Sequence, residues 1–256
     1  MSQADKARRF KALHIPGNPL VLYNIWDAGS AKTVASAGAQ ALATGSWSVS
    51  AAQGYGDGQA IPLDFALQII ARITESTELP VSVDFEGGYA TDPTELATNV
   101  TRVIAAGAIG INFEDQIVGG QGLHPIADQV QRIKAIRQAA EQSSIPLFIN
   151  ARTDLFLKAP ADQHAALVPE ALARAALYQA AGASGFFVPG LVDPVLLAAV
   201  VQGTPLPVNA IASPAQQPAA KRASLGVARI SHGPFPWRAA MAGFVDGWKA
   251  ATAHQT

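Results

Sequence analysis

The sequence contains no cysteine and few charged residues, which make up only 14% of the chain. Without cysteine the protein can form no disulfide bond, no thiolate metal site and no catalytic thiol. The 18 basic and 19 acidic residues nearly cancel, and neither sign forms a block of any length. We therefore expect neither a nucleic acid nor a membrane surface as a partner.

Long apolar runs are missing as well. The N-terminal residues 1–9 lead into no apolar signal core, and no run approaches the roughly 18 apolar residues of a membrane span. Hydrophobic residues nevertheless make up 49% of the chain, which is enough for a sizeable buried core. We expect a cytoplasmic protein with a large interior.

Short strands alternate with helices along the whole chain. Strands are expected over 20–26, 41–46, the start of 80–89, 110–115, 147–154, 185–189, 206–211 and 227–231. Helices are expected over 3–14, 29–38, 126–142, 165–181 and 236–251, and after Pro62, Asp92-Pro93, Asp193-Pro194 and Ser213-Pro214. Eight strand–helix units without a linker predict one domain over 1–256, a parallel (β/α)8 TIM-type barrel.

An open doubly wound sheet is the rival architecture. It would need a glycine-rich phosphate fingerprint after its first strand, and the segment 27–31, Asp-Ala-Gly-Ser-Ala, is not one. The closed barrel therefore remains the expected fold.

The stretch 80–89, Pro-Val-Ser-Val-Asp-Phe-Glu-Gly-Gly-Tyr, holds the first candidate site. It begins as a β-branched run and ends in two acids followed by paired glycines. Because side chains alternate along a strand, Asp84 and Glu86 are expected on one face. Two carboxylates so placed repel each other unless a cation or a donor lies between them.

The other expected strands also end in polar residues, although their interiors are apolar. These positions are Asp27, Thr44, Gly45, Ser46, Asp84, Glu86, Glu114, Asp115, Asn150, Arg152, Asp154, Asn209, Ser231 and His232. The active site of a parallel barrel is built at the carboxyl ends of its strands. Several acids with an arginine and amides suit Mg²⁺, with Mn²⁺ as an alternative, and a carboxylate substrate paired to the arginine.

Four segments, in their order and spacing, resemble the isocitrate lyase/phosphoenolpyruvate mutase superfamily. They are 24–28 (Asn-Ile-Trp-Asp-Ala), 84–89 (Asp-Phe-Glu-Gly-Gly-Tyr), 112–116 (Asn-Phe-Glu-Asp-Gln) and 150–154 (Asn-Ala-Arg-Thr-Asp). The resemblance runs from about residue 8 to 235. It implies a Mg²⁺-dependent barrel that acts on α-oxo or α-hydroxy carboxylates through an enolate-like intermediate.

The resemblance also implies roles for single residues. Asp84 resembles the direct metal ligand, Glu86 and Glu114 its companions acting through water, and Asp57 the acid that hydrogen-bonds metal-bound water. The segment Thr44-Gly45-Ser46 resembles the backbone donors for the substrate carboxylate, Arg152 the arginine that polarises the oxo acid, and Asn209 an amide at its far end. Salt bridges to Arg152 and a plain turn aspartate at Asp57 are the structural alternatives. Trp47 is expected either to wall the pocket or to pack in the core or an interface.

One loop departs from the family pattern. Lyases of the superfamily carry Lys-Arg-Cys-Gly-His after the Glu-Asp-Gln strand end, whereas this chain has Ile-Val-Gly-Gly-Gln-Gly-Leu-His over 117–124. The lysine and asparagine of the phosphonate branch are absent too. Within this loop only His124 remains as a candidate acid or base, and metal-bound water with Asp57 is the alternative to the missing loop acid. The glycine pair and Glu86 also replace the commoner Asp-x-Asp-x-Gly-Tyr-Gly, which predicts a slightly different metal geometry.

We therefore expect a Mg²⁺-dependent carbon–carbon lyase on a small 2-oxo or 2-hydroxy di-acid. Oxaloacetate decarboxylation is favoured because it needs an electron sink but no strong external base. A phosphonopyruvate-type hydrolase or mutase and a non-catalytic oxo-acid-binding relative are the alternatives. Family members exchange the last helix between subunits, and Trp237, Phe244 and Trp248 are apolar enough for such a contact, so a homodimer or homotetramer is expected.

Overall fold

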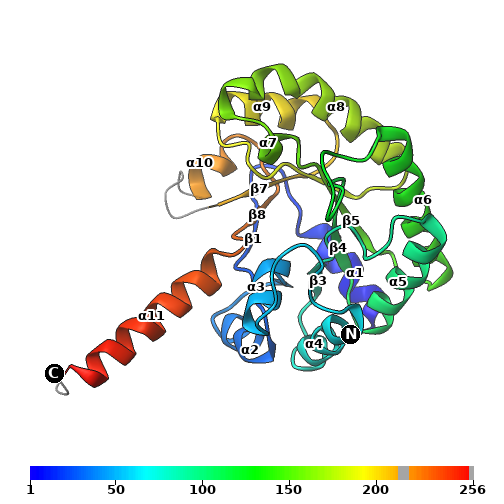
Figure 1. Cartoon of the computed structure of the whole chain (residues 1–256). Helices are drawn as coiled ribbons and strands as arrows, with labels where there is room; N and C mark the ends of the chain where they lie inside the picture. The colour runs from blue at the N-terminus through cyan, green and yellow to red at the C-terminus, as the bar shows by residue number, and fades with distance from the viewer. Residues whose placement is uncertain (213–218, 254–256) are drawn as a thin grey trace.

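The computed structural model describes residues 1–212 and 219–253, and within them eight parallel strands form one sheet. The strands are β1 (Leu20–Leu22), β2 (Leu42–Ala43), β3 (Val81–Asp84), β4 (Gly110–Glu114), β5 (Phe148–Arg152), β6 (Gly185–Phe187), β7 (Val208–Ile211) and β8 (Arg229–Ser231). Their order is β1-β8-β7-β6-β5-β4-β3-β2, and a parallel bridge between Ile25 and Thr44 connects the two end strands. The expected (β/α)8 barrel is confirmed (Figure 1).

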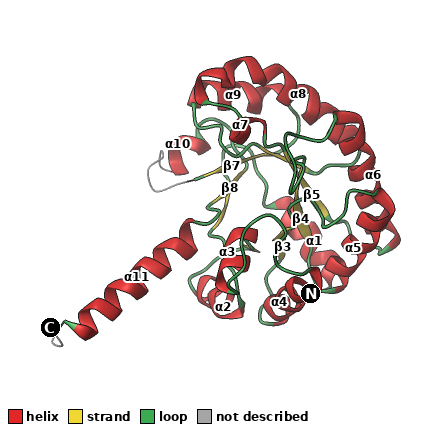
Figure 2. Ribbon diagram, in the orientation of Figure 1, coloured by secondary structure: helices red, strands yellow, loops and turns green. Residues whose placement is uncertain are grey.

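Helices surround the strands, as the ribbon coloured by secondary structure shows (Figure 2). They are α1 (Gln3–Ala12), α2 (Ala28–Ser36), α3 (Ser46–Ala52), α4 (Leu63–Glu75), α5 (Pro93–Ala105), α6 (Ile126–Gln142), α7 (Leu155–Lys158), α8 (His164–Ala180), α9 (Pro194–Gly203), α10 (Ala219–Ala223) and α11 (Phe235–Thr252). A 3₁₀ turn, η1 (Ala161–Gln163), precedes α8. The helix expected after Ser213-Pro214 begins outside the described residues, which resume at α10.

The expected start signals hold at two helices. Asp92 caps α5 by accepting from the backbone N–H groups of Thr94 and Glu95, and Asp193 caps α9 in the same way. Asp27 proves to be a cap as well, since its carboxylate accepts from Ser30 N at 2.7 Å at the start of α2. Its polar position at a strand end is explained by helix capping.

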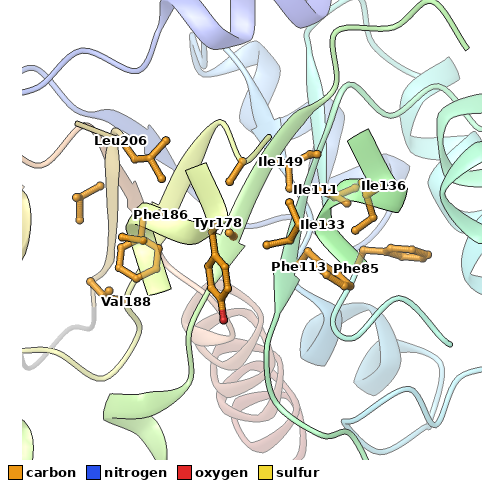
Figure 3. Close-up of a cluster of buried hydrophobic side chains, with 14 of the residues drawn as sticks. Phe85, Ile111, Phe113, Ile133, Ile136, Ile149, Tyr178, Phe186, Val188 and Leu206 are labelled. Atoms are coloured by element: carbon orange, nitrogen blue, oxygen red, sulfur yellow. The ribbon is translucent and has the colours of Figure 1, made fainter. Parts of the chain in front are cut away.

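The main core lies between the strands and the outer helices, where Ile111 and Phe113 of β4 meet Ile133 and Ile136 of α6 (Figure 3). A smaller core lies at the other end of the barrel, where Phe10 of α1 packs edge-on against Phe148 at 5.4 Å. Each fully buried side chain of this size contributes about 1.5–3 kcal/mol relative to exposure. The expected interior is therefore present, and it holds the strand ends in place.

The last helix, α11, projects away from the barrel instead of packing along it (Figure 1). Phe244 and Trp248 on this helix are 74% and 64% exposed. On the first strand and just after it, Val21 and Tyr23 are both 47% exposed. Two apolar surfaces therefore lack a covering element within the described part of the protomer. In the same part of the chain, no helix combines the length and hydropathy needed to cross a bilayer.

Candidate active site

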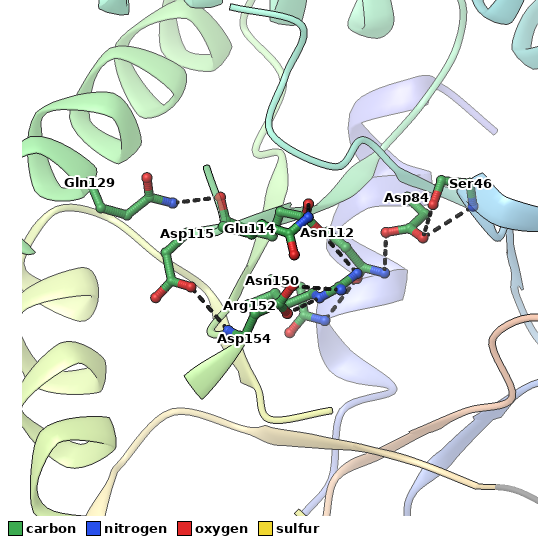
Figure 4. Close-up of polar contacts among 10 residues, drawn as sticks. Ser46, Asp84, Asn112, Glu114, Asp115, Gln129, Asn150, Arg152 and Asp154 are labelled. Carbon is green, nitrogen blue, oxygen red and sulfur yellow. Dashed lines mark hydrogen bonds and ion pairs between the residues drawn. The ribbon is translucent and has the colours of Figure 1, made fainter. Parts of the chain in front are cut away.

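Asp84 lies at the end of β3 and is held by side chains from two neighbouring segments (Figure 4). Its Oδ2 accepts from the backbone N and the Oγ of Ser46 at 3.1 and 2.8 Å, and its Oδ1 accepts from Asn112 Nδ2 at 3.2 Å. The backbone N–H of Asp84 donates to the Thr44 hydroxyl at 3.0 Å. These contacts fix the direction of a carboxylate that remains partly open to solvent.

Glu86 reaches the same area by a different route from the one that strand alternation predicts. The strand ends at Asp84, and Glu86 adopts a left-handed φ of 50°, so the expected simple alternation is wrong at this position. Its carboxylate is buried, and neither oxygen has a hydrogen-bond partner. Burial, with the nearby charges of Asp84 and Asp57, raises the pKa of Glu86 to about 7.

The glycines after Glu86 are required by packing. Gly88 has a φ of 81°, and a Cβ at this position would lie 2.2 Å from Leu96 Cδ1. Any side chain there would push the loop away from α5. Gly88 therefore keeps the strand end and its two acids against the barrel.

Arg152, at the end of β5, is clamped by two carboxylates. Asp154 accepts from its Nε at 2.6 Å and its Nη2 at 2.9 Å, and Glu114 Oε2 lies 2.9 Å from Nη1. Burial alone would lower the pKa of Arg152, but Glu114, Asp154 and Asp84 raise it above its ordinary value. The hydrogen bonds to Asp154 occupy two of the five guanidinium N–H groups and Glu114 adds an ion pair, so N–H groups on the terminal nitrogens remain for another acceptor.

Glu114 is buried on the neighbouring strand, where burial raises its pKa and the Arg152 guanidinium acts in the opposite direction. Its contact with Arg152 was the structural alternative to a metal role for Glu114 and to a substrate-binding role for Arg152. The ion pair is present, and it leaves Glu114 Oε1 with only a long contact, 3.4 Å, to Gln116 Nε2. Glu114 can therefore pair with Arg152 through Oε2 and still offer Oε1 to a metal-bound water.

A buried network behind this pair was missed from the sequence. Asp115 Oδ1 accepts from the backbone N–H of Asp154 at 3.0 Å, and Oδ2 accepts from Arg174 and Tyr178 of α8 at 3.0 and 2.9 Å. It holds Asp154, and through it Arg152, in one orientation. The signal was present at Arg174 and Tyr178, one turn apart on an otherwise alanine-rich apolar helix.

The two candidate proton-transfer residues, Asp57 and His124, lie on different loops. Asp57 is exposed on the loop after α3, where desolvation raises its pKa and the charges of Asp84 and Arg152 are close enough to affect it. His124 is 8% exposed and lines a cavity of about 210 Å³ together with Gln59 and Arg132. Burial, followed by the Arg132 charge, lowers the pKa of His124.

The backbone N–H groups of the expected substrate-binding segment, residues 44–46, all donate to other groups of the protein. Thr44 N donates to Ser82 O at 3.0 Å, Gly45 N to Ile25 O at 3.2 Å, and Ser46 N to Asp84. The segment begins α3, a short helix that the sequence did not predict. Trp47 is half-buried and packs edge-on against Trp237 of α11 at 5.2 Å.

Asn209 and the residues around it form a polar layer inside the barrel. Asn209 Nδ2 donates to Ser231 Oγ at 3.2 Å, and the same hydroxyl accepts from Arg229 Nε at 3.2 Å. Arg229 is fully buried, and its Nη2 donates to Asn112 Oδ1 at 3.1 Å. Sequence reasoning missed Arg229, although an arginine between Ala228 and Ile230 in a strand was a visible signal.

The acids at the barrel mouth are candidate ligands for a divalent cation. In the described ranges, no three His, Cys, Asp or Glu side chains meet closely enough to form a complete metal cage. The buried, unpartnered Glu86 oxygens and Asp84 are all oxygen donors, and they line a cavity of about 30 Å³. That volume admits water. The residues fit Mg²⁺, which takes oxygen ligands and usually keeps several waters.

Comparison with known proteins agrees with this architecture. Relatives that the chain matches include a lyase and a mutase, 2-methylisocitrate lyase and phosphoenolpyruvate phosphomutase. The model of the phosphoenolpyruvate phosphomutase family matches residues 10–252. The chain belongs to this family, within the isocitrate lyase/phosphoenolpyruvate mutase superfamily, which confirms the resemblance seen in the four motifs.

Several relatives cover most of the chain. An uncharacterized protein of Mycobacterium tuberculosis is 35% identical over 233 residues, covering 91% of this chain and 84% of its own. A 2-methylisocitrate lyase of Escherichia coli is 31% identical, covering 73% of this chain and 63% of its own. An oxaloacetate decarboxylase of Pseudomonas savastanoi pv. phaseolicola is 28% identical over 255 residues, covering 96% and 84%.

Two solved structures are also similar. A candidate phosphonomutase from Burkholderia cenocepacia J2315 shares 45% identity, covers 99% of both chains and has a TM-score of 0.93. A phosphonopyruvate hydrolase in complex with oxalate and Mg²⁺ has a TM-score of 0.84 at 21% identity, covering 98% of this chain and 87% of its own. The second likeness shows a shared fold.

Proposed function

We propose that the protein is a Mg²⁺-dependent carbon–carbon lyase on a small 2-oxo or 2-hydroxy di-acid, with oxaloacetate decarboxylation as its favoured reaction. The observation that carries the proposal is Arg152, which Asp154 and Glu114 hold at the barrel mouth with N–H groups on its terminal nitrogens left over. The related oxaloacetate decarboxylase supports the choice of substrate.

A fixed guanidinium suits this chemistry because decarboxylation breaks the bond between C3 and the leaving carboxylate. The bond's electron pair moves into the enolate of pyruvate as CO₂ departs, and C3 then takes up a proton. The free N–H groups of Arg152 donate to the oxygen on which negative charge develops, and they need no rearrangement to do so. When bound, Mg²⁺ would add Lewis-acid stabilisation, with Asp84 as the direct ligand and Glu86 and Glu114 holding its water.

Other reactions of the superfamily demand a group that the chain lacks. Loop 117–124 carries neither cysteine nor lysine, and its one imidazole, His124, lies in the cavity beside Gln59 and Arg132. Cleavage of 2-methylisocitrate needs a proton donor for the departing carbanion, whereas decarboxylation can take its proton from water or from Asp57. The missing donor therefore favours the decarboxylase.

The test is turnover of oxaloacetate by purified protein with Mg²⁺, followed as pyruvate formed above the rate with Mg²⁺ alone. Arg152→Lys should lower kcat/KM at least about a hundredfold, because a lysine cannot reproduce the fork that Asp154 holds. Arg9→Lys, on an exposed face of α1, is the matched control and should leave turnover unchanged.

Phosphonopyruvate and 2-methylisocitrate are tested alongside oxaloacetate, and the three form the substrate panel. Turnover of phosphonopyruvate alone would replace the decarboxylase with the phosphonate branch. If no substrate turns over while oxalate binds, and Asp84→Ala abolishes that binding, the protein is a non-catalytic oxo-acid receptor.

A further inference from the structure

Gln59 joins the loop that carries Asp57 to the strand end that carries Asp84 and Glu86. Three backbone N–H groups converge on the end of its side chain, so the atom facing them is the amide oxygen. In that orientation it accepts from Gly87 at 3.0 Å, Gly88 at 3.0 Å and Tyr89 at 2.9 Å. Successive backbone N–H groups pointing at one oxygen form a concave anion-type site, and here a side chain of the same protein fills it.

The backbone on both sides of this contact is strained, which indicates that the contact holds it. Gln59 has a φ of 61°, and Glu86 and Tyr89 have φ values of 50° and 57°. A residue other than glycine in the left-handed region costs about 1 kcal/mol or more, and persists only when its surroundings fix it. The residues before Gln59, over 52–58, are exposed, so their own burial does not hold the loop.

Arg132 holds the other side of the same strand-end loop. Its Nη2 donates to Gly87 O at 2.6 Å and to Ala90 O at 3.0 Å, while its guanidinium carbon lies 4.7 Å from the centroid of the Phe113 ring. Arg132 thus binds the carbonyl groups of the loop and Gln59 binds its N–H groups. The loop over 86–90 is fixed from α6, which leaves the loop over 54–60 as the part that Gln59 must hold.

We propose that Gln59 is a positioning residue, which holds the Asp57 loop closed over the carboxylates of the proposed site by filling the N–H cluster of 87–89. Its contribution to catalysis rests on the proposed function, whereas its contact with the loop does not. Opening this contact would release the Asp57 loop from the strand end that carries Asp84 and Glu86.

Hydrogen exchange tests the contact without reference to activity. Gly87 and Tyr89 are the informative amides, because Gly88 N also donates to Phe85 O at 2.9 Å. In Gln59→Met, which keeps the length but removes the acceptor, exchange at both amides should accelerate at least about tenfold. Gln59→Glu keeps an acceptor and should stay within about threefold of wild type. Unchanged exchange in Gln59→Met would overturn the proposal.

Kinetics test the positioning role on the active enzyme. Gln59→Met should lower kcat at least about tenfold with little change in KM, and Gln59→Glu should recover most of that loss. Combining Gln59→Met with Asp57→Asn should cost little more than Asp57→Asn alone, because both act through one group. The exposed Gln142→Met on α6 is the control and should behave as wild type.

The outcomes separate the two proposals. If wild type turns over none of the panel, the proposed function fails, and the exchange measurement still decides whether Gln59 holds the loop. If the exchange accelerates while kcat is unchanged, the positioning role is wrong. If the losses of kcat in Gln59→Met and Asp57→Asn add up in the double variant, and if Gln59→Met and Gln59→Glu lower Tm equally, Gln59 is only a structural residue.

Discussion

Replacing Arg229 with methionine is expected to stabilise the fold. Arg229 is fully buried inside the barrel, donates to Asn112 and Ser231, and its Nη1 has no hydrogen-bond partner. Burial lowers the pKa of Arg229 to about 9, although the charge of Asp84 acts to raise it. Since a tenfold change in proton affinity is about 1.4 kcal/mol, the fall from 12.5 corresponds to a cost of about 5 kcal/mol at neutral pH.

Methionine removes that cost but gives up two hydrogen bonds, each contributing about 1 kcal/mol, and leaves some unfilled space. We therefore expect Arg229→Met to raise the free energy of unfolding by about 1–3 kcal/mol at pH 7.5, as when other buried charges are replaced by apolar side chains. For a chain of this size, each kcal/mol raises Tm by about 2–4 °C. Urea unfolding in EDTA buffer measures the difference in the absence of any metal.

The pH dependence gives the sharper result. A basic group with a depressed folded-state pKa costs stability at all pH values below that pKa, and the cost fades as pH rises from about 9 toward the unfolded value. The advantage of the methionine variant should therefore be largest near pH 7.5 and clearly smaller at pH 10. A variant less stable than wild type at pH 7.5, or a gap independent of pH, would refute the reasoning. Exposed Arg9→Met should change stability by less than about 0.5 kcal/mol.

Two further predictions concern Glu86 and α11. In metal-free buffer the pKa of Glu86, raised to about 7, means that wild-type stability falls as pH rises from about 4.5 to 7, so Glu86→Gln should gain up to about 3 kcal/mol on wild type between pH 5 and 8 in urea unfolding. Parallel curves would show that folding does not shift the pKa of Glu86. Trp248 is 64% exposed beside Phe244, so this apolar face is a candidate contact between copies of the chain. Trp248→Glu should shift a homo-oligomer toward monomer in light scattering, and the control Lys249→Gln should not. A monomeric wild type would contradict this prediction.

The barrel could be predicted from the sequence because its signals are local and repeat eight times. Asp92 and Asp193 each precede a proline that starts a helix, and both were found in the capping position. The expected helix over 126–142 has the observed bounds. The expected strands were too long, since 147–154 shortens to Phe148–Arg152, because the ends of elements can be placed from sequence only to within one or two residues.

The candidate site was less predictable, for physical reasons that differ between residues. Motif and strand-end position brought Asp84, Glu114 and Arg152 to one edge of the barrel, as expected of parallel strands. The left-handed turn at Glu86 could not be inferred, because alternation holds only while the strand lasts. The contact of Gln59 with the loop over 87–89 joins segments almost thirty residues apart, and a surface glutamine gives no sign of such a partner.

Asn112 explains why stability and the proposed chemistry are coupled in this barrel. Its amide nitrogen donates to Asp84 at the mouth, while its amide oxygen accepts from Asn150 at 2.8 Å and from the costly Arg229 below. Turning the Asn112 amide over would break all three hydrogen bonds. The donors Asn150 and Arg229 therefore keep its oxygen facing them and its nitrogen facing Asp84. With Arg229 gone, Asn150 alone would orient the amide. The buried cation therefore helps to fix the direction of the Asp84 carboxylate at the expense of folding stability, the kind of conflict expected near a functional site.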